Sequence, residues 1–184
     1  MNEIKVAIVG DSGVGKTSML TRYVANTFPD SMAPTRGAIT LSKELDIDGK
    51  IYQLRVWDVG GQEEFRNLAP MYYNHANIAI IVYDCTNPKS YQAVASWMEE
   101  LKGELDNNAV FVICANKTDV EAQKDPDPEI VKKYAITNDA LFFETSAVSN
   151  SNINNLFETA ARKYLNTLHP APKKEQEDNG CCRI

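Results

Sequence analysis

Residues 10–17, with the sequence GDSGVGKT, have the types and spacing that bind phosphate groups. Glycines at positions 10, 13 and 15 let the backbone curl so that successive N–H groups point inward, toward phosphate oxygens. Lys16 would reach the β- and γ-phosphates of a nucleotide, and the Thr17 hydroxyl would hold Mg²⁺. The alternative is a Gly-rich turn with an exposed lysine, which the apolar run at 4–9 in front of the loop makes less favourable.

A second group of candidate residues begins at Asp58, at the end of another apolar run. The Asp58 carboxylate could hold Mg²⁺ directly or through water, and Gly61 could offer its backbone N–H to a terminal phosphate. Gln62 could orient an attacking water. Taken alone, Asp58 is equally well explained as a turn or helix-capping aspartate.

Two further polar segments, 116–119 (NKTD) and 144–147 (ETSA), also follow apolar runs. The Asp119 carboxylate can accept hydrogen bonds from the ring N–H and the exocyclic amine of guanine, whereas adenine would leave it unpaired. A solvated loop after a strand is the alternative for NKTD. In this order along the chain, the segments favour a guanine nucleotide.

Alternating strand-like and helical segments would position these residues. The pattern predicts an α/β fold with a doubly wound, mostly parallel sheet. Asp48-Gly49-Lys50 predicts a hairpin between two antiparallel strands. In such sheets ligands bind beyond the carboxyl ends of the strands, so the four polar segments should converge there. The expected strands are 4–9, 41–47, 51–57, 78–83, 109–115 and 141–143, the expected helices 16–26, 90–105, 128–136 and 153–168, and a polar loop is expected at 28–40.

The 184 residues, 43% of them hydrophobic, suit one domain at 1–168 followed by a flexible polar tail at 169–184. A formal net charge of −6 without a Lys/Arg-rich block argues against nucleic acid as a partner. Two of the four cysteines lie in apolar runs and two lie beside the C-terminus, which is not a disulfide framework. No secretory signal is present, and the longest apolar run, 78–83, is too short to span a bilayer, so we expect a reducing cytosol.

With these segments in view, the chain resembles the Ras superfamily of small GTPases, and the Rab branch most closely, over residues 3–168 and the tail cysteines. The Rab resemblance lies in YYNHA at 72–76, IVYDCT at 81–86 and RVW at 55–57. The TRGA segment at 35–38 and the Cys-Cys-x-x ending look most like the early-endosomal Rab group. The resemblance implies a P-loop NTPase fold with a six-stranded sheet and five helices, GTP and GDP as ligands, and Mg²⁺ as cofactor. It also implies two nucleotide-sensing switch loops, at 30–39 and 60–73.

The resemblance also implies roles for single residues. Phe28 would pack on the guanine face, and Thr35 would ligate Mg²⁺ only when the γ-phosphate is present. Asn116 would tie the base loop to the phosphate loop, and Lys117 would lie along the base, while the backbone at 146–147 would face the guanine carbonyl. The full nucleotide-binding set is Asp11, Ser12, Gly13, Val14, Gly15, Lys16, Thr17, Ser18, Phe28, Thr35, Gly61, Asn116, Lys117, Asp119, Ser146 and Ala147; the metal ligands are Thr17, Thr35 and Asp58; and the catalytic residues are Lys16 and Gln62.

Several residues depart from the usual Rab pattern. Arg36 and Thr40 stand where the early-endosomal group usually has Ile and Phe, on the surface that effectors contact. Met32 lies near the position of the common lid tyrosine, and Val59-Gly60 replaces the usual Thr-Ala. WDVGGQ at this point is the Arf wording, but an Arf-type protein would want Gly at position 2 for myristoylation, where this chain has Asn2. These departures all bear on partner choice and switch movement.

The C-terminal Cys181-Cys182-Arg183-Ile184 is a prenylation signal, the alternative being an accidental exposed pair. Because basic and acidic residues balance in the tail, no polybasic second anchor exists, and we expect two prenyl groups. The resemblance implies geranylgeranyl chains, handled by a Rab escort protein and a GDP-dissociation inhibitor. A monomer cycling between the cytosol and the cytosolic face of intracellular, endosomal membranes would follow.

The favoured hypothesis is a GTP/GDP switch that hydrolyses GTP slowly and regulates vesicle trafficking. No arginine finger is evident in cis, so intrinsic turnover on the order of 10⁻⁴–10⁻² s⁻¹ is expected, together with a GTPase-activating protein, an exchange factor and effectors. The alternatives are a nucleotide-bound interaction module that barely cycles and an Arf- or Ras-like switch outside the Rab family. A P-loop ATPase or metabolite kinase is disfavoured by NKTD.

Overall fold

A computed structural model describes residues 2–28, 33–62 and 66–168. Its six strands form one sheet in the order β2-β3-β1-β4-β5-β6, in which β2 is antiparallel to β3 and the other neighbours are parallel. The predicted α/β fold with a mostly parallel sheet is confirmed. The strands are β1 (Asn2–Val9), β2 (Ala38–Ile47), β3 (Lys50–Val59), β4 (Ile78–Asp84), β5 (Val110–Asn116) and β6 (Leu141–Glu144).

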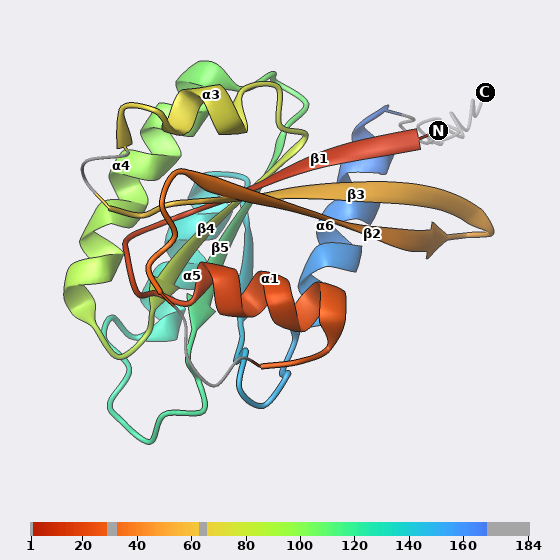
Figure 1. The fold of residues 1–184 in the computed structure, drawn as a ribbon. Coiled ribbons are helices and arrows are strands. Elements are labelled where there is room, and N and C mark those ends of the chain that lie inside the picture. Colours follow the sequence, from red (N-terminus) through yellow and green to blue (C-terminus); the bar gives the residue numbers. More distant parts are fainter. Residues whose placement is uncertain (1, 29–32, 63–65, 169–184) are drawn as a thin grey trace, which may run out of the picture.

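Five helices among the described residues cover the two faces of this sheet. Apolar side chains of α1 and α6 pack on one face, and those of α3, α4 and α5 pack on the other. Figure 1 shows α1 close to α6, with α4 on the opposite side of the strands. The helices are α1 (Lys16–Ala25), α3 (Ala69–Tyr73), α4 (Pro88–Glu104), α5 (Pro128–Thr137) and α6 (Ile153–Leu168).

The alternation of side chains along the central strands divides the core into two apolar clusters. In β1, Ile4, Val6 and Ile8 point toward α1 and α6, whereas Ala7 and Val9 point the other way. Because both faces are covered, these strands carry continuous apolar runs, as parallel strands buried on both sides do. Because the helices pack on the two faces of the sheet, the loops that connect strands to helices lie at the ends of the strands.

The hairpin between β2 and β3 follows the predicted turn. Ile47 pairs with Lys50, and the two turn residues, Asp48 and Gly49, have φ values of 54° and 77°. Positive φ at both positions is the signature of a type I′ turn, whose twist matches that of the strands. The pairing continues to Ala38 opposite Val59, so β2 begins inside the segment predicted as loop, and the prediction for 38–40 was wrong.

The five helices that the resemblance implied are found, but the position of the short helix α3 was not predicted. Its five residues carry no helical repeat long enough to be seen in the sequence, and Pro70 occupies its first turn, where the missing N–H costs nothing. No described helix has both the length and the apolar character that a membrane crossing requires.

Candidate functional site

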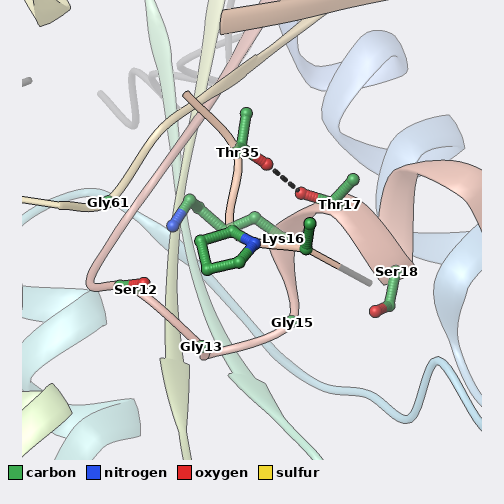
Figure 2. A pocket seen from close by; sticks show the side chains of 10 residues that line it. Ser12, Gly13, Gly15, Lys16, Thr17, Ser18, Thr35 and Gly61 are labelled. Atoms are coloured by element: carbon green, nitrogen blue, oxygen red, sulfur yellow. Dashed lines mark hydrogen bonds between the residues drawn. The ribbon is translucent and has the colours of Figure 1, made fainter. Parts of the chain in front are cut away.

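The four polar segments that the sequence singles out meet at one edge of the sheet. Ile8 at the end of β1 lies beside Asp58 of β3. Asp84 at the end of β4 lies beside Asn116 of β5. A cavity of about 260 Å³ opens at this edge (Figure 2). It is lined by Ser12, Gly13, Gly15, Lys16, Thr17, Ser18, Ala33, Pro34, Thr35 and Gly61.

The loop between β1 and α1 leads directly into the helix start. Gly15 has a φ of 97° and precedes the first helical residue, Lys16. A Cβ at Gly15 would lie 2.4 Å from Asn116 Nδ2, so only glycine fits there. Because the first residues of α1 line the cavity, the unpaired N–H groups and positive end of the helix lie beside it. The local geometry is that of an anion-binding site.

Lys16 is nearly buried, with 5% of its surface exposed. Its Nζ donates hydrogen bonds to the backbone carbonyls of Gly10 and Asp11, both at 2.7 Å. Burial lowers the pKa of Lys16 to about 8, although the nearby Asp58 and Asp11 carboxylates favour the charged form. A polyanion in the cavity would add negative charge beside this ammonium group and so favour its protonated form.

Two threonine hydroxyls converge on the Asp58 carboxylate. Thr17 Oγ1 lies 2.8 Å from Thr35 Oγ1, and Figure 2 shows the two side chains pointing toward each other. Thr17 donates a hydrogen bond to Asp58 Oδ2, and Thr35 lies 3.4 Å from the same oxygen. Asp58 is fully buried, and burial raises its pKa, against the lowering effect of hydrogen bonds from Thr17 and the charge of Lys16.

The other Asp58 oxygen, Oδ1, is buried and has no hydrogen-bond partner among the described residues. An unpaired carboxylate oxygen beside two hydroxyls fits a hard cation such as Mg²⁺, which takes few protein ligands and keeps sites for water and phosphate oxygens. The described residues contain no cluster of three His, Cys, Asp or Glu side chains that could hold a metal ion.

Two adjacent glycines bring the end of β3 against both neighbouring segments. The Gly60 N–H donates to the Gly37 carbonyl at 2.7 Å, and a Cβ at Gly60 would lie 2.7 Å from the Thr35 carbonyl oxygen. A Cβ at Gly61 would lie 2.4 Å from the Gly10 carbonyl oxygen. The absence of side chains at 60 and 61 therefore permits the packing that holds Thr35 near the Asp58 carboxylate.

Gln62 lies next to these glycines and lines a second cavity of about 480 Å³, which adjoins the first through Thr17 and Thr35. Arg36 and Ile39 also line this second cavity. Gln62 therefore lines the same cavity as the two threonines, Thr17 and Thr35, that converge on Asp58.

At the other end of the site, Asn116 connects two loops. Its Nδ2 donates to the Val14 carbonyl in the phosphate loop at 2.9 Å, and its Oδ1 accepts from Thr145 Oγ1 at 3.2 Å. Lys117, at a φ of 69°, forms an ion pair with Asp84 at 2.6 Å. The segments after β4, β5 and β6 are thereby joined to the phosphate loop.

Asp119 accepts a hydrogen bond from Ser146 Oγ at 2.6 Å, which joins the segments after β5 and β6. The Ser146 backbone pairs with Ser151 and holds the start of the following turn. Ala147 is buried in the cluster under α1 and α6, whereas the Phe28 side chain is 41% exposed. This end of the site therefore has a buried floor and an exposed aromatic ring beside it.

Comparison with known proteins places the chain in a family. The family model described as the Ras family matches residues 5–166, nearly the whole described chain. The chain belongs to the Ras family.

Relatives within the family carry Rab names. Human Rab-22A is 38% identical over 91% of this chain and 86% of its own length. Human Rab-31 is 35% identical over 100% of the chain and 92% of its own length. RabJ of Dictyostelium discoideum is 37% identical over 91% of this chain, but the match spans only 65% of RabJ. The Rab resemblance, of the early-endosomal type, is confirmed.

The chain is therefore a Rab-like small GTPase, an enzyme that hydrolyses GTP and takes part in membrane trafficking. A Ras-family member binds guanine nucleotide and works with regulators and effectors. The alternatives outside the Rab family, and a module that barely cycles, are not favoured.

Three residues that hold the Asn116 end of the site were not singled out from the sequence. Thr145 lies within a segment that the sequence marked, and Asp84 lies within IVYDCT, which was used only as a sign of the Rab branch. Asp84 is the last residue of β4 and Thr145 directly follows β6, and this position at the end of a strand could have singled them out. Arg22, on α1, contacts the segment after β6 through side-chain hydrogen bonds, and no local pattern indicates it.

Some predictions fall outside the described residues. These are the prenylation cysteines Cys181 and Cys182 with the rest of the tail, Met32 near the lid position, and residues 30–32 and 63–65 of the two predicted switches.

Proposed function

We propose that the cavity at the sheet edge binds GTP or GDP together with Mg²⁺, and that this binding sets the conformation of the Thr35 segment. One observation carries the proposal: Thr17, Thr35 and Asp58 converge beside Lys16, and one buried oxygen of Asp58 has no partner among the described residues. Bound Mg²⁺ would neutralise charge on the phosphates.

At the phosphate end, the backbone N–H groups of residues 13–18 and the Lys16 ammonium would bind phosphate oxygens, while Thr17 and Asp58 would hold the metal ion. Support comes from their place along the cavity and at the start of α1. The Gly61 N–H would contact the terminal phosphate, and Gln62 would hold the attacking water. Both residues follow β3, Gly61 lining the first cavity and Gln62 the second.

At the base end, Asp119 would accept from guanine, Lys117 would lie along the base, and Phe28 would cover its face. The backbone of 146–147 would face the guanine carbonyl. Support comes from the hydrogen bond that joins Asp119 to Ser146, and from the hydrogen bond by which Asn116, next to Lys117, reaches the Val14 carbonyl of the phosphate loop.

Switching would depend on Thr35. Its hydroxyl lies near Asp58, and its segment contacts the end of β3 through the Gly60–Gly37 hydrogen bond. Loss of the γ-phosphate would remove one of the ligands that keep Thr35 in place. Two prenyl groups on Cys181 and Cys182 would attach the protein to the cytosolic face of endosomal membranes, with an escort protein and a GDP-dissociation inhibitor as partners.

The nucleotide that copurifies with the protein tests this proposal. Denaturation followed by chromatography should recover GDP or GTP at close to one guanine nucleotide per protein molecule. Single-turnover hydrolysis should be slow, on the order of 10⁻⁴–10⁻² s⁻¹, and Gln62→Leu should slow it by about tenfold or more. The exposed Gln92→Leu on α4 is the matched control and should hydrolyse GTP at the normal rate. Adenine nucleotide in the purified protein, or equal rates for both glutamine variants, would contradict the proposal.

A further inference from the structure

Arg22 connects three segments that lie at the base end of the site. It stands in the last turn of α1, and its Nη1 donates to the Asn26 carbonyl at 2.9 Å. Its Nε donates to the Ala147 carbonyl at 2.9 Å, and its Nη2 lies 3.2 Å from the Val148 carbonyl. A single guanidinium group thus holds the end of α1 and two successive peptide groups that are more than 120 residues away along the chain.

The same guanidinium lies beside Phe28. The Arg22 Cζ atom is 6.0 Å from the centre of the Phe28 ring, within the range of a cation–π contact. Asn26, between them, ends the helix in a left-handed conformation, and its Oδ1 accepts from Asn150 Nδ2 at 3.2 Å. The chain that leads from α1 to Phe28 is therefore linked to the segment after β6 at two points.

We propose that Arg22 is a positioning residue for the guanine base. By fixing the Ala147 and Val148 carbonyls, it sets the orientation of the backbone that would face the guanine carbonyl, and by contacting Phe28 it sets the ring that would cover the base. This inference rests on the proposed function, because it assigns Arg22 to the base end of the same site. Arg22 would act through these groups and not through a contact of its own with the base.

A purely structural role is the alternative, since a cation in the last turn of a helix is favourable there by itself. The planar guanidinium distinguishes the two roles. Lysine would keep the charge near the helix end but could not reproduce three directed hydrogen bonds. Two of the three hydrogen bonds also join the helix to the Ala147 and Val148 carbonyls.

The test compares Arg22→Gln, Arg22→Lys and the wild type in the release of GDP labelled on its ribose, at millimolar Mg²⁺. We expect release to be about tenfold faster for Arg22→Gln, with Arg22→Lys between it and the wild type. Arg162→Gln is the matched control. Arg162 is an α6 arginine that pairs with Asp48 and Glu158, and its loss should leave release unchanged.

A second readout separates positioning from stability. GDP and 6-thio-GDP differ only at the atom that Ala147 would face, so the wild type should release the thio analogue faster. In Arg22→Gln the ratio of the two release rates, 6-thio-GDP over GDP, should fall toward one. Equal release by wild type and Arg22→Gln, or a faster release that leaves the preference for GDP unchanged, would overturn the inference. If Arg22→Gln does not fold, the same two outcomes in Arg22→Lys decide. A wild type that retains no guanine nucleotide would instead refute the proposed function.

Discussion

The two ends of the site satisfy their polar groups in different ways. At the base end, Asn116 and Asp119 are paired with protein groups through Val14, Thr145 and Ser146. At the phosphate end, the Lys16 ammonium is desolvated, and an Asp58 oxygen has no partner among the described residues. The side chains at the base end are therefore held in place by protein partners, whereas the phosphate end leaves buried polar groups that a ligand could pair.

Physical cost explains why the difference matters. An unpaired buried carboxylate oxygen costs about 1–3 kcal/mol, and a poorly solvated ammonium adds to that cost. Nucleotide and metal would remove both costs on binding. We therefore expect changes at the phosphate end to affect affinity and stability in opposite directions, and changes at the base end to affect both in the same direction.

The largest expected effect comes from Lys16→Met. This variant loses the ammonium that would contact the phosphates, so GDP affinity should fall by about 10²–10³-fold. Because the buried charge disappears, the melting temperature of the nucleotide-free protein should not fall, and we expect it to rise. Titration calorimetry and thermal unfolding measure the two quantities. Lys163→Met, which removes a partner of Asp139, is the control. A parallel loss of affinity and stability in Lys16→Met would break the comparison.

The same lysine predicts a pH dependence. Burial lowers the pKa of Lys16 to about 8 in the folded, nucleotide-free protein, against about 10.5 in the unfolded chain. Between these values the unfolded state binds more protons, so stability should rise with pH. Chemical denaturation at pH 7.5 and pH 9.5 should show the wild type gaining about 1–2 kcal/mol relative to Lys16→Met. A difference independent of pH would mean that Lys16 is not desolvated.

Gly60→Ala tests the contact between the end of β3 and the Thr35 segment. The new Cβ would collide with the Thr35 carbonyl, 2.7 Å away, and with the Gly37 carbonyl at 2.9 Å. Mg²⁺ should slow the release of a bound GTP analogue about tenfold less in this variant than in the wild type. The release of GDP should change much less. Nucleotide release over a Mg²⁺ titration measures this. Gly103→Ala, in α4 with no atom near its Cβ, should behave like the wild type or be slightly more stable.

The smallest effect is expected at the base end, from Asp84→Asn. Burial favours the neutral form of this carboxyl, but hydrogen bonds from Lys117 and Thr86 outweigh it and hold the pKa of Asp84 below its usual value. The variant weakens the pairing of Lys117, so GDP release should be about threefold faster, and the unfolding free energy should fall by about 1 kcal/mol. Stopped-flow release with the exposed Asp139→Asn as control checks this. An unchanged release rate would show that the Asp84–Lys117 pair does not position the base end.

The phosphate loop, NKTD and the strand-end position of each polar segment could be predicted, because these features depend on local spacing and on a sheet topology that the apolar runs indicate. The hairpin turn was likewise encoded in Asp48-Gly49. Arg22 could not be predicted, since its partners at 147–148 come close only after α1 and the segment after β6 are placed together. The short α3 and the early start of β2 depend on tertiary pairing in the same way.

Hydrogen–deuterium exchange of the protein bound to GDP or to a non-hydrolysable GTP analogue, both with Mg²⁺, tests the central claim most directly. Residues 33–39 and 60–62 should exchange more slowly with the analogue, because the γ-phosphate would hold Thr35 and Gly61 in place. Residues 116–119 and 145–148 should exchange equally in the two states. Equal exchange at 33–39, or a change confined to the base end, would contradict the account.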